Sequence, residues 1–281
     1  MEPNAMHDID ELNAILKPQG FKIVMFLNDE AIDVKLRPIP VDEQVRRLRA
    51  ALDGLTALTR QMGTFPIQYK KTIEQVFNDV SINGAINELG DLFNAYGSDK
   101  ASTHDYHRVY AALLEPLRNK SIRILEIGLG TNNIDIQSNM GCGGRPGASL
   151  RAFRDWVPDA MVFGADVDER ILFAEERIET YFVDQTKPQT LRELSAKFEP
   201  HSFDLIIDDG LHIPEANINT VNFALSLLKD TGILVVEDVA EEYFEFWYTV
   251  FALLSPRYIC HFLKTKAACI VLIGRNLPNI D

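Results

Sequence analysis

The sequence predicts an α/β protein with a Rossmann-like, mostly parallel sheet that carries an antiparallel edge strand, preceded by a small N-terminal α+β region. Three observations predict this fold: short apolar runs alternate with helical segments, several runs end in an acidic residue, and one of them leads into a glycine turn. The 281 residues suffice for one full domain and a smaller appendage. We therefore expect an auxiliary, lid or oligomerisation region over residues 1–96 and a ligand-binding domain over residues 97–281.

The central strand is expected in the stretch Ile122-Arg-Ile-Leu-Glu-Ile-Gly-Leu-Gly130. Its β-branched and apolar residues suit a strand that is buried on both faces of a parallel sheet. Gly128 and Gly130 allow the backbone to turn tightly and to approach a ligand closely. Open α/β sheets bind nucleotides at such a strand end, although short glycine turns without a ligand are also common.

The residues around this turn favour one cofactor over another. A dinucleotide-binding turn would have a third glycine at position 133, where this chain has Asn133. The carboxylate of Glu126 would repel a pyrophosphate, but it could accept hydrogen bonds from the ammonium group of S-adenosylmethionine. The turn therefore favours S-adenosylmethionine over NAD, and a dehydrogenase is the weaker interpretation.

The remaining elements are expected in an alternating order. N-terminal to the central strand, the patterns predict a hairpin from residues 21–27 and 32–39, a helix over residues 43–62, a helical segment over residues 67–96 that is interrupted near residues 81–84, and a helix over residues 106–117. C-terminal to it, they predict helices over residues 149–156 and 243–254, and strands over residues 161–165, 178–183, 203–207, 232–236, 258–263 and 269–274. The last two strands are expected to form an antiparallel hairpin at the sheet edge. The long turn over residues 131–147 is expected to fold over a ligand, unless it is a flexible insertion.

Acidic residues follow the second and third of the predicted parallel strands. Asp166 is placed where nucleotide-binding sheets put an acid on the ribose hydroxyls, with Asp168 as the second choice. Asp184 could lie near the adenine. Each of these carboxylates could instead cap the structure that follows its strand.

Two further strands end in paired acids, Asp208-Asp209 and Glu237-Asp238. Four carboxylates at one sheet edge would repel one another, and Mg²⁺, which prefers oxygen ligands, would relieve this repulsion. Because side chains alternate along a strand, Asp208 and Asp209 should point in different directions. We expect Asp209 and Asp238 as the principal ligands and Glu237 next; helix capping or binding of the cofactor amine is the alternative.

A histidine lies three residues beyond Asp209. His212 beside a metal and a cofactor could act as a general base, whereas the alternative is a purely structural histidine.

Charge and hydropathy restrict the partners. The net charge of −13 disfavours nucleic acid and anionic membranes, and no apolar run is as long as a membrane helix. A small neutral or cationic molecule is easier to accommodate. The start of the sequence lacks signal-peptide features, so the cytoplasm is the expected location. An amphipathic N-terminal helix makes homo-oligomerisation an open possibility.

From residue 97 onward, the sequence resembles class I S-adenosylmethionine-dependent methyltransferases. Within that class it is similar to the metal-dependent O-methyltransferases of macrolide sugars, the mycinamicin and tylosin types. The resemblance is carried by these motifs: Gly97-Ser-Asp-Lys100 with His104 and Tyr106, Leu125-Glu-Ile-Gly-Leu-Gly130, Pro146-Gly-Ala-Ser-Leu-Arg151, Gly164-Ala-Asp166, Ile207-Asp-Asp-Gly-Leu-His212 and Val236-Glu-Asp238.

The resemblance implies an S-adenosylmethionine-dependent O-methyltransferase that acts on a hydroxyl of a small molecule, a sugar or a natural-product intermediate. It implies Asp209, Glu237 and Asp238 as Mg²⁺ ligands and His212, together with Asp209, as the catalytic residues. It implies that the cofactor is bound by Ser98, Lys100, Glu126, Gly128, Gly130, Ser149, Asp166, Asp184 and Asp208. The chain departs from the family at Leu211, where serine is usual, and in its wider loop over residues 132–144.

Two other functions stay open on the sequence alone. The first is a metal-independent N-methyltransferase or carboxyl-methyltransferase of small molecules. The second is a non-catalytic, cofactor-binding partner module whose function depends on the N-terminal helices.

Overall fold

The computed structural model describes residues 82–255 and 257–277, together with residues 50, 54–55, 57–58 and 71–72. The chain divides into two compact units, residues 1–49 and 50–281, and every described residue lies in the second. The predicted hairpin over residues 21–39 lies outside the described residues, as does most of the predicted helix over residues 43–62. The auxiliary role of residues 1–96 stays a prediction.

The described part of the chain contains a nine-stranded sheet in the order β1-β8-β9-β7-β6-β2-β3-β5-β4. Strands β2, β3, β5, β6 and β7 are parallel, whereas β9 runs antiparallel to both β7 and β8. The predicted fold class is therefore confirmed. The bounds are β1 (Lys71–Thr72), β2 (Arg123–Ile127), β3 (Met161–Asp166), β4 (Ala174–Glu175), β5 (Ile178–Phe182), β6 (Phe203–Asp208), β7 (Leu228–Val239), β8 (Ile259–Lys264) and β9 (Cys269–Gly274).

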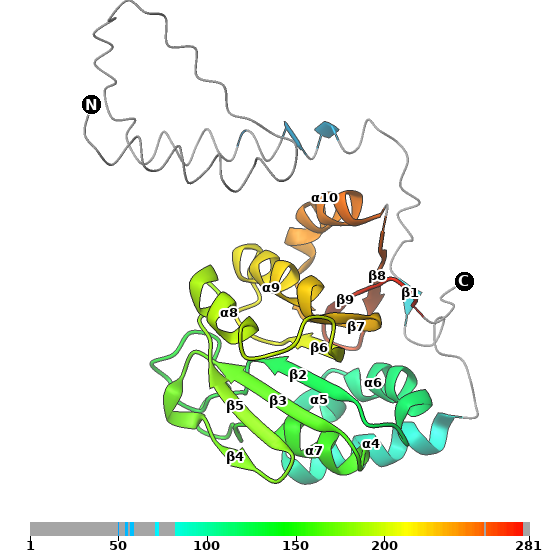
Figure 1. Ribbon diagram of the computed structural model, residues 1–281, viewed down its shortest axis with the longest axis vertical. Coiled ribbons are helices and arrows are strands. Elements are labelled where there is room, and N and C mark those ends of the chain that lie inside the picture. The colour runs from blue at the N-terminus through cyan, green and yellow to red at the C-terminus, as the bar shows by residue number, and fades with distance from the viewer. Residues whose placement is uncertain are drawn as a thin grey trace, which may run out of the picture. The chain divides into compact units, whose positions relative to one another are not determined.

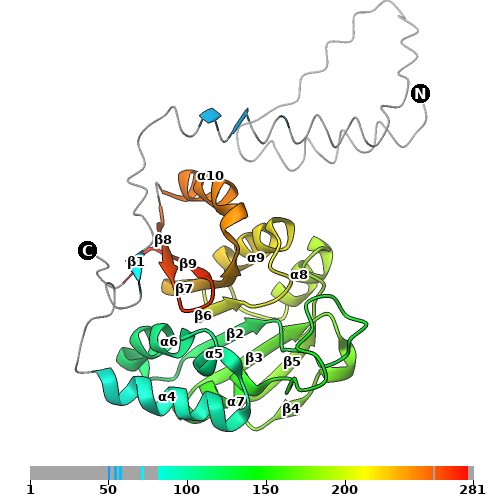
Figure 2. The same ribbon diagram turned by 180° about the vertical axis from the view of Figure 1, so that it is seen from behind.

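Helices cover both faces of the sheet (Figure 1). One face carries α4 (Asn83–Tyr96), α5 (Asp99–Ser102), α6 (Tyr106–Leu114) and α7 (Ala148–Trp156), and the other carries α8 (Pro188–Ser195), α9 (Pro214–Leu227) and α10 (Phe244–Leu254), as the reverse view in Figure 2 also shows. Short 3₁₀ turns lie at Glu115–Leu117, Glu169–Ile171 and Glu241–Tyr243. Because side chains alternate along each strand, Ile124 belongs to the core under α4 and α7, whereas its neighbour Leu125 belongs to the core under α9.

Three predicted elements differ from the structure. Residues 71–72 were expected in a helix but form β1, because the backbone there pairs with β8. The helix predicted over residues 106–117 ends at Leu114; Pro116 lies in the 3₁₀ turn that follows and has no N–H to continue the α-helix. Strand β7 is longer than predicted, because Leu228 pairs with Phe203 and Val239 pairs with Cys269.

Helix α4 is part of the core of this unit. Leu89 and Phe93 are fully buried, and the Phe93 ring makes edge contacts with Tyr110 and Phe153. The helix ends at Gly97, whose left-handed backbone lets the N–H of Ser98 donate to the Phe93 carbonyl. This turn brings α5 directly to the sheet.

The parallel register places the carboxyl ends of the strands at one edge. Ile127 of β2 pairs with Ala165 of β3 and with Asp208 of β6, and Asp208 pairs in turn with Val236 of β7. The residues that follow these positions therefore converge, as the sequence predicted.

Candidate functional site

A cavity of about 370 Å³ lies at the carboxyl edge of the parallel strands. It is lined by the turn after β2, the ends of β3 and β5, the loop over residues 131–140, and the two acidic turns after β6 and within β7. Of the described residues that line it, seven are aspartate or glutamate and none is lysine or arginine. An acidic cavity of this kind favours cationic ligands.

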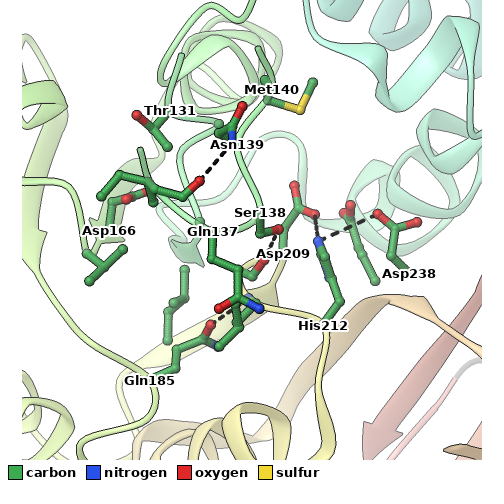
Figure 3. Close-up of a pocket in the computed structure, with 18 of the residues that line it drawn as sticks. Thr131, Gln137, Ser138, Asn139, Met140, Asp166, Gln185, Asp209, His212 and Asp238 are labelled. Carbon is green, nitrogen blue, oxygen red and sulfur yellow. Dashed lines mark hydrogen bonds and ion pairs between the residues drawn. The ribbon is translucent and has the colours of Figure 1, made fainter. Parts of the chain in front are cut away.

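Asp209, His212 and Asp238 come together on one side of this cavity (Figure 3). The Nε2 atom of His212 lies 3.9 Å from Oδ1 of Asp209 and 3.9 Å from Oδ2 of Asp238. One ligand atom from each of these three residues can be chosen so that all lie within 4.8 Å of one another. Such spacing is compatible with a small divalent cation, whose opposite ligands are about 4 Å apart.

Left-handed backbone conformations set up this arrangement. His212 has φ +56° in the turn after β6, and Asp238 has φ +51° at the irregularity of β7 between Val236 and Val239. Gly128 has φ +97°, and a Cβ atom there would lie 1.9 Å from the carbonyl oxygen of Asp209. The turn after β2 and the turn after β6 therefore lie so close together that only glycine fits at position 128.

The other oxygens of the two aspartates are occupied. Oδ2 of Asp209 accepts from the Lys100 ammonium at 2.6 Å, and Oδ1 of Asp238 accepts from the Tyr106 hydroxyl at 2.6 Å. Nδ1 of His104 also lies 3.4 Å from that Asp238 oxygen. The oxygens that face His212 accept no hydrogen bond from the described part of the chain.

Glu237 lines the same cavity, but its carboxylate is buried and both of its oxygens have partners within the protein. Its carboxylate accepts from Lys100 at 2.6 Å and from the Tyr110 hydroxyl, and it is 1% exposed. Burial, followed by the nearby charge of Asp209, raises the pKa of Glu237 well above its ordinary value. Of the three predicted metal ligands, the structure thus brings Asp209 and Asp238 to the cavity edge and turns Glu237 toward Lys100.

The predicted cofactor residues fall into three groups. Gly128, Gly130, Asp166 and Asp184 line the main cavity, and Ser98, Lys100 and Ser149 line a smaller adjoining cavity of about 40 Å³. Glu126 is fully buried and pairs with Lys100 at 3.1 Å and with the Ser149 hydroxyl at 2.5 Å. Asp208 lies outside both linings: it is fully buried and accepts from Gln185 and Asn217.

Asp166 joins the glycine turn to the end of β3. Its two oxygens accept the backbone N–H groups of Leu129, at 2.7 Å, and Asp168, at 2.9 Å. Burial raises the pKa of Asp166 above its ordinary value. Asp184 accepts from the backbone and hydroxyl of Thr186 and pairs with Lys187.

Asp168 holds the long loop in place. It accepts from the Thr131 hydroxyl at 2.6 Å, from the Asn133 amide at 2.7 Å and from the Arg170 guanidinium at 2.6 Å. These bonds, that of Arg170 first, hold the pKa of Asp168 well below its ordinary value. Asp168 is 2% exposed and does not line the main cavity, so Asp166 occupies the position nearer a ligand.

Sequence reasoning missed several residues around the cavity. Gln137, Ser138, Asn139 and Met140 line it, and the Ser138 hydroxyl donates to the Gly210 carbonyl at 2.9 Å (Figure 3). Nothing in the loop sequence indicated which of its residues face inward. Gln185, which binds both Asp208 and the backbone N–H of Leu211, carried no signal either.

The fold and the acidic edge together define the class of structure. The described region has the Rossmann-like fold of methyltransferases: it matches a structure of the MycE methyltransferase from the mycinamycin biosynthetic pathway, in complex with Mg, SAH and mycinamycin VI, with a TM-score of 0.53. The two chains are 20% identical, and the match covers 68% of this chain and 56% of MycE.

The relatives in sequence are also methyltransferases. The chain is 30% identical over 155 residues to the 8-demethyl-8-α-L-rhamnosyl tetracenomycin-C 2′-O-methyltransferase of Streptomyces olivaceus, a match that covers 55% of this chain and 38% of the relative. It is 31% identical over 157 residues to the demethylmacrocin O-methyltransferase of Streptomyces fradiae, covering 56% and 37%. The chain therefore spans less than half the length of these relatives. The resemblance found from the motifs is confirmed.

No protein-family model matches the chain. None of the helices that the structure describes is long and apolar enough to cross a membrane. The cytoplasmic location and the homo-oligomer stay predictions.

The Asp168 contacts generate a pH-dependent prediction. Asp168→Asn removes the charge that binds Arg170 and should lower the melting temperature at pH 7 by about 3–8 °C. Because the folded-state pKa is depressed, the contribution of Asp168 is present above its unfolded-state pKa of about 3.9 and is lost as the pH falls toward the folded-state value. Melting curves should therefore show the difference between variant and wild type shrinking below pH 4. Asp159→Asn, at an exposed position, is the control; a pH-independent difference would contradict this role.

Proposed function

We propose that this chain is an S-adenosylmethionine-dependent O-methyltransferase that methylates a hydroxyl group of a small molecule, with assistance from Mg²⁺. The observation that carries the proposal is the pair of carboxylate oxygens, one from Asp209 and one from Asp238, each 3.9 Å from His212 Nε2. These three residues would supply a base and two cation ligands in a cavity that Asp166 and the glycine turn after β2 also line.

The cavity suits S-adenosylmethionine in charge and in shape. Its acidic lining would compensate the positive sulfonium and ammonium groups, whereas a pyrophosphate cofactor would be repelled. Gly128, Asp166 and Asp184 line the cavity, and the two aspartates would contact the ribose and the adenine. When bound, this cofactor supplies an activated methyl group.

The acidic edge suits a hard cation. Asp209 Oδ1 and Asp238 Oδ2 would hold Mg²⁺, with Glu237 behind them. When bound, the ion would lower the pKa of an acceptor hydroxyl and fix its direction. MycE was solved with Mg, SAH and mycinamycin VI, and the curated relatives described above are named for O-methylation of tetracenomycin and macrocin precursors. These names support a hydroxylated natural product, and a sugar hydroxyl in particular, as the acceptor.

His212 is placed to take the proton of the acceptor. Its Nε2 faces the cavity between the two aspartates, which would stabilise the imidazolium after proton transfer. Tyr106 fixes Asp238 from the other side, so the aspartate does not turn away from His212. The loop residues from Gln137 to Met140 cover the cavity and would exclude water from the transfer.

Replacing His212 tests the role of the base. We expect His212→Asn to lower kcat by about 10²- to 10⁴-fold, because asparagine tolerates φ +56° but accepts no proton at neutral pH. The dissociation constant for S-adenosylmethionine, measured by calorimetry, should stay within about threefold of wild type. His201→Asn is a matched control, since His201 also has a left-handed backbone (φ +52°) and precedes β6 at the opposite end of the strand. Full activity of His212→Asn on a sugar acceptor would contradict the assignment.

Removing the metal tests its participation. Dialysis against a chelator should abolish methyl transfer, and added Mg²⁺ should restore it, because the hydroxyl would lose its activating ligand. Calorimetry without cofactor should show that Asp238→Asn weakens Mg²⁺ binding by tenfold or more. Undiminished activity in the chelator would instead favour a metal-independent N-methyltransferase or carboxyl-methyltransferase.

A further inference from the structure

Lys100 is a buried cation that has no role in the mechanism proposed above. Of the lysines that the structure describes, it alone is buried, at 2% exposure. It lies in α5, and its Nζ atom is 3.1 Å from Glu126, 2.6 Å from Asp209 and 2.6 Å from Glu237. These three acids come from the ends of three neighbouring parallel strands, so one ammonium group joins β2, β6 and β7.

The surroundings keep this lysine charged. Burial disfavours the ammonium, but Asp209, Glu237 and Glu126 outweigh that effect and hold the pKa of Lys100 well above its ordinary value. Without Lys100, three carboxylates would remain close together, and two of them, Glu126 and Glu237, are buried. Such a group of like charges is strongly destabilising unless a proton or another cation enters.

Hydrogen bonds and ion pairs around Lys100 involve nearly every acid oxygen. Glu126 uses one oxygen for Lys100 and the other for Ser149, and Glu237 uses one for Lys100 and the other for Tyr110. Asp209 differs, because only its Oδ2 contacts Lys100 while Oδ1 faces His212. Lys100 thus divides the acidic edge into an inner half, whose oxygens have partners within the protein, and an outer half, which is left for an external cation.

We propose that Lys100 is a positioning residue, a permanent internal cation that keeps the acidic edge assembled without a metal and presents Oδ1 of Asp209 to His212 and to Mg²⁺. This inference rests on the proposed function for the identity of the metal. It differs from the cofactor-binding role that the sequence motif implied, because the ammonium group already has three carboxylate partners within 3.1 Å.

The test compares melting temperatures of the full chain at pH 8, first in a chelator and then in excess Mg²⁺, with no cofactor present. Lys100→Met keeps the length of the side chain and removes its charge. In the chelator it should melt about 10 °C or more below wild type. Mg²⁺ should then raise its melting temperature by several degrees more than that of wild type, because the ion replaces the missing charge.

Two further variants make the outcome specific. Lys120→Met changes an exposed lysine and should match wild type in both buffers. Lys100→Met/Glu237→Gln removes one negative charge together with the positive one, and it should recover part of the stability and lose the additional Mg²⁺ effect. If Lys100→Met does not fold, the double variant should still fold; failure of both, or equal Mg²⁺ effects in Lys100→Met and wild type, would overturn the proposal.

Calorimetry with S-adenosylmethionine separates this inference from the proposed function. Lys100→Met should bind the cofactor within about threefold of wild type, provided that Mg²⁺ is present to hold the site together. A loss of more than tenfold under those conditions would show that Lys100 acts on the cofactor and would overturn the positioning role. Failure of the wild-type chain to bind cofactor would instead contradict the proposed function and leave the melting comparison valid.

Discussion

The structure depends on how it compensates the negative charge that its parallel strands collect at one edge. Glu126, Asp209, Glu237 and Asp238 lie together at the carboxyl edge of the sheet, because the parallel register aligns the ends of strands β2, β6 and β7. Burial of such a group is unfavourable without cations. The ammonium of Lys100, placed there by the turn at Gly97, lies within 3.1 Å of three of these carboxylates. The fold of α4 and α5 is thereby coupled to the chemistry of the sheet edge.

This compensation is incomplete on the side of the cavity, and the proposed function depends on the remaining charge. Asp209 and Asp238 each keep one oxygen directed at His212, and five further acidic residues line the cavity. A sulfonium cofactor and a divalent ion are both cations, so the same field attracts both. Binding of either cation, the cofactor or the divalent ion, would reduce the repulsion among the acidic side chains of the site. A small hydroxylated acceptor carries no charge that would oppose either of them.

The sequence predicted those features that follow from strand periodicity and topology. Acids directly after β-branched runs had to meet at one sheet edge, so the convergence of Asp209 and Asp238 near His212 could be predicted, as could the different directions of Asp208 and Asp209. The sequence could not show which partner each carboxylate would take. Glu237 binds Lys100 and Tyr110, whereas Asp208 binds Gln185 and Asn217. These pairings depend on side-chain directions that arise only from tertiary packing. The short strand β1 was missed for the same reason, because its pairing with β8 outweighs local helical preference.

Binding of the sulfonium cofactor tests the central claim most directly. The measurement is a calorimetric titration of the full chain with S-adenosylmethionine, with S-adenosylhomocysteine as a product-like comparison. The account predicts saturable binding of each at one site per chain, because the cavity has an acidic lining beside the glycine turn after β2. Absence of binding at millimolar concentrations of both compounds would contradict the account, because the cavity would then not be a site for this cofactor.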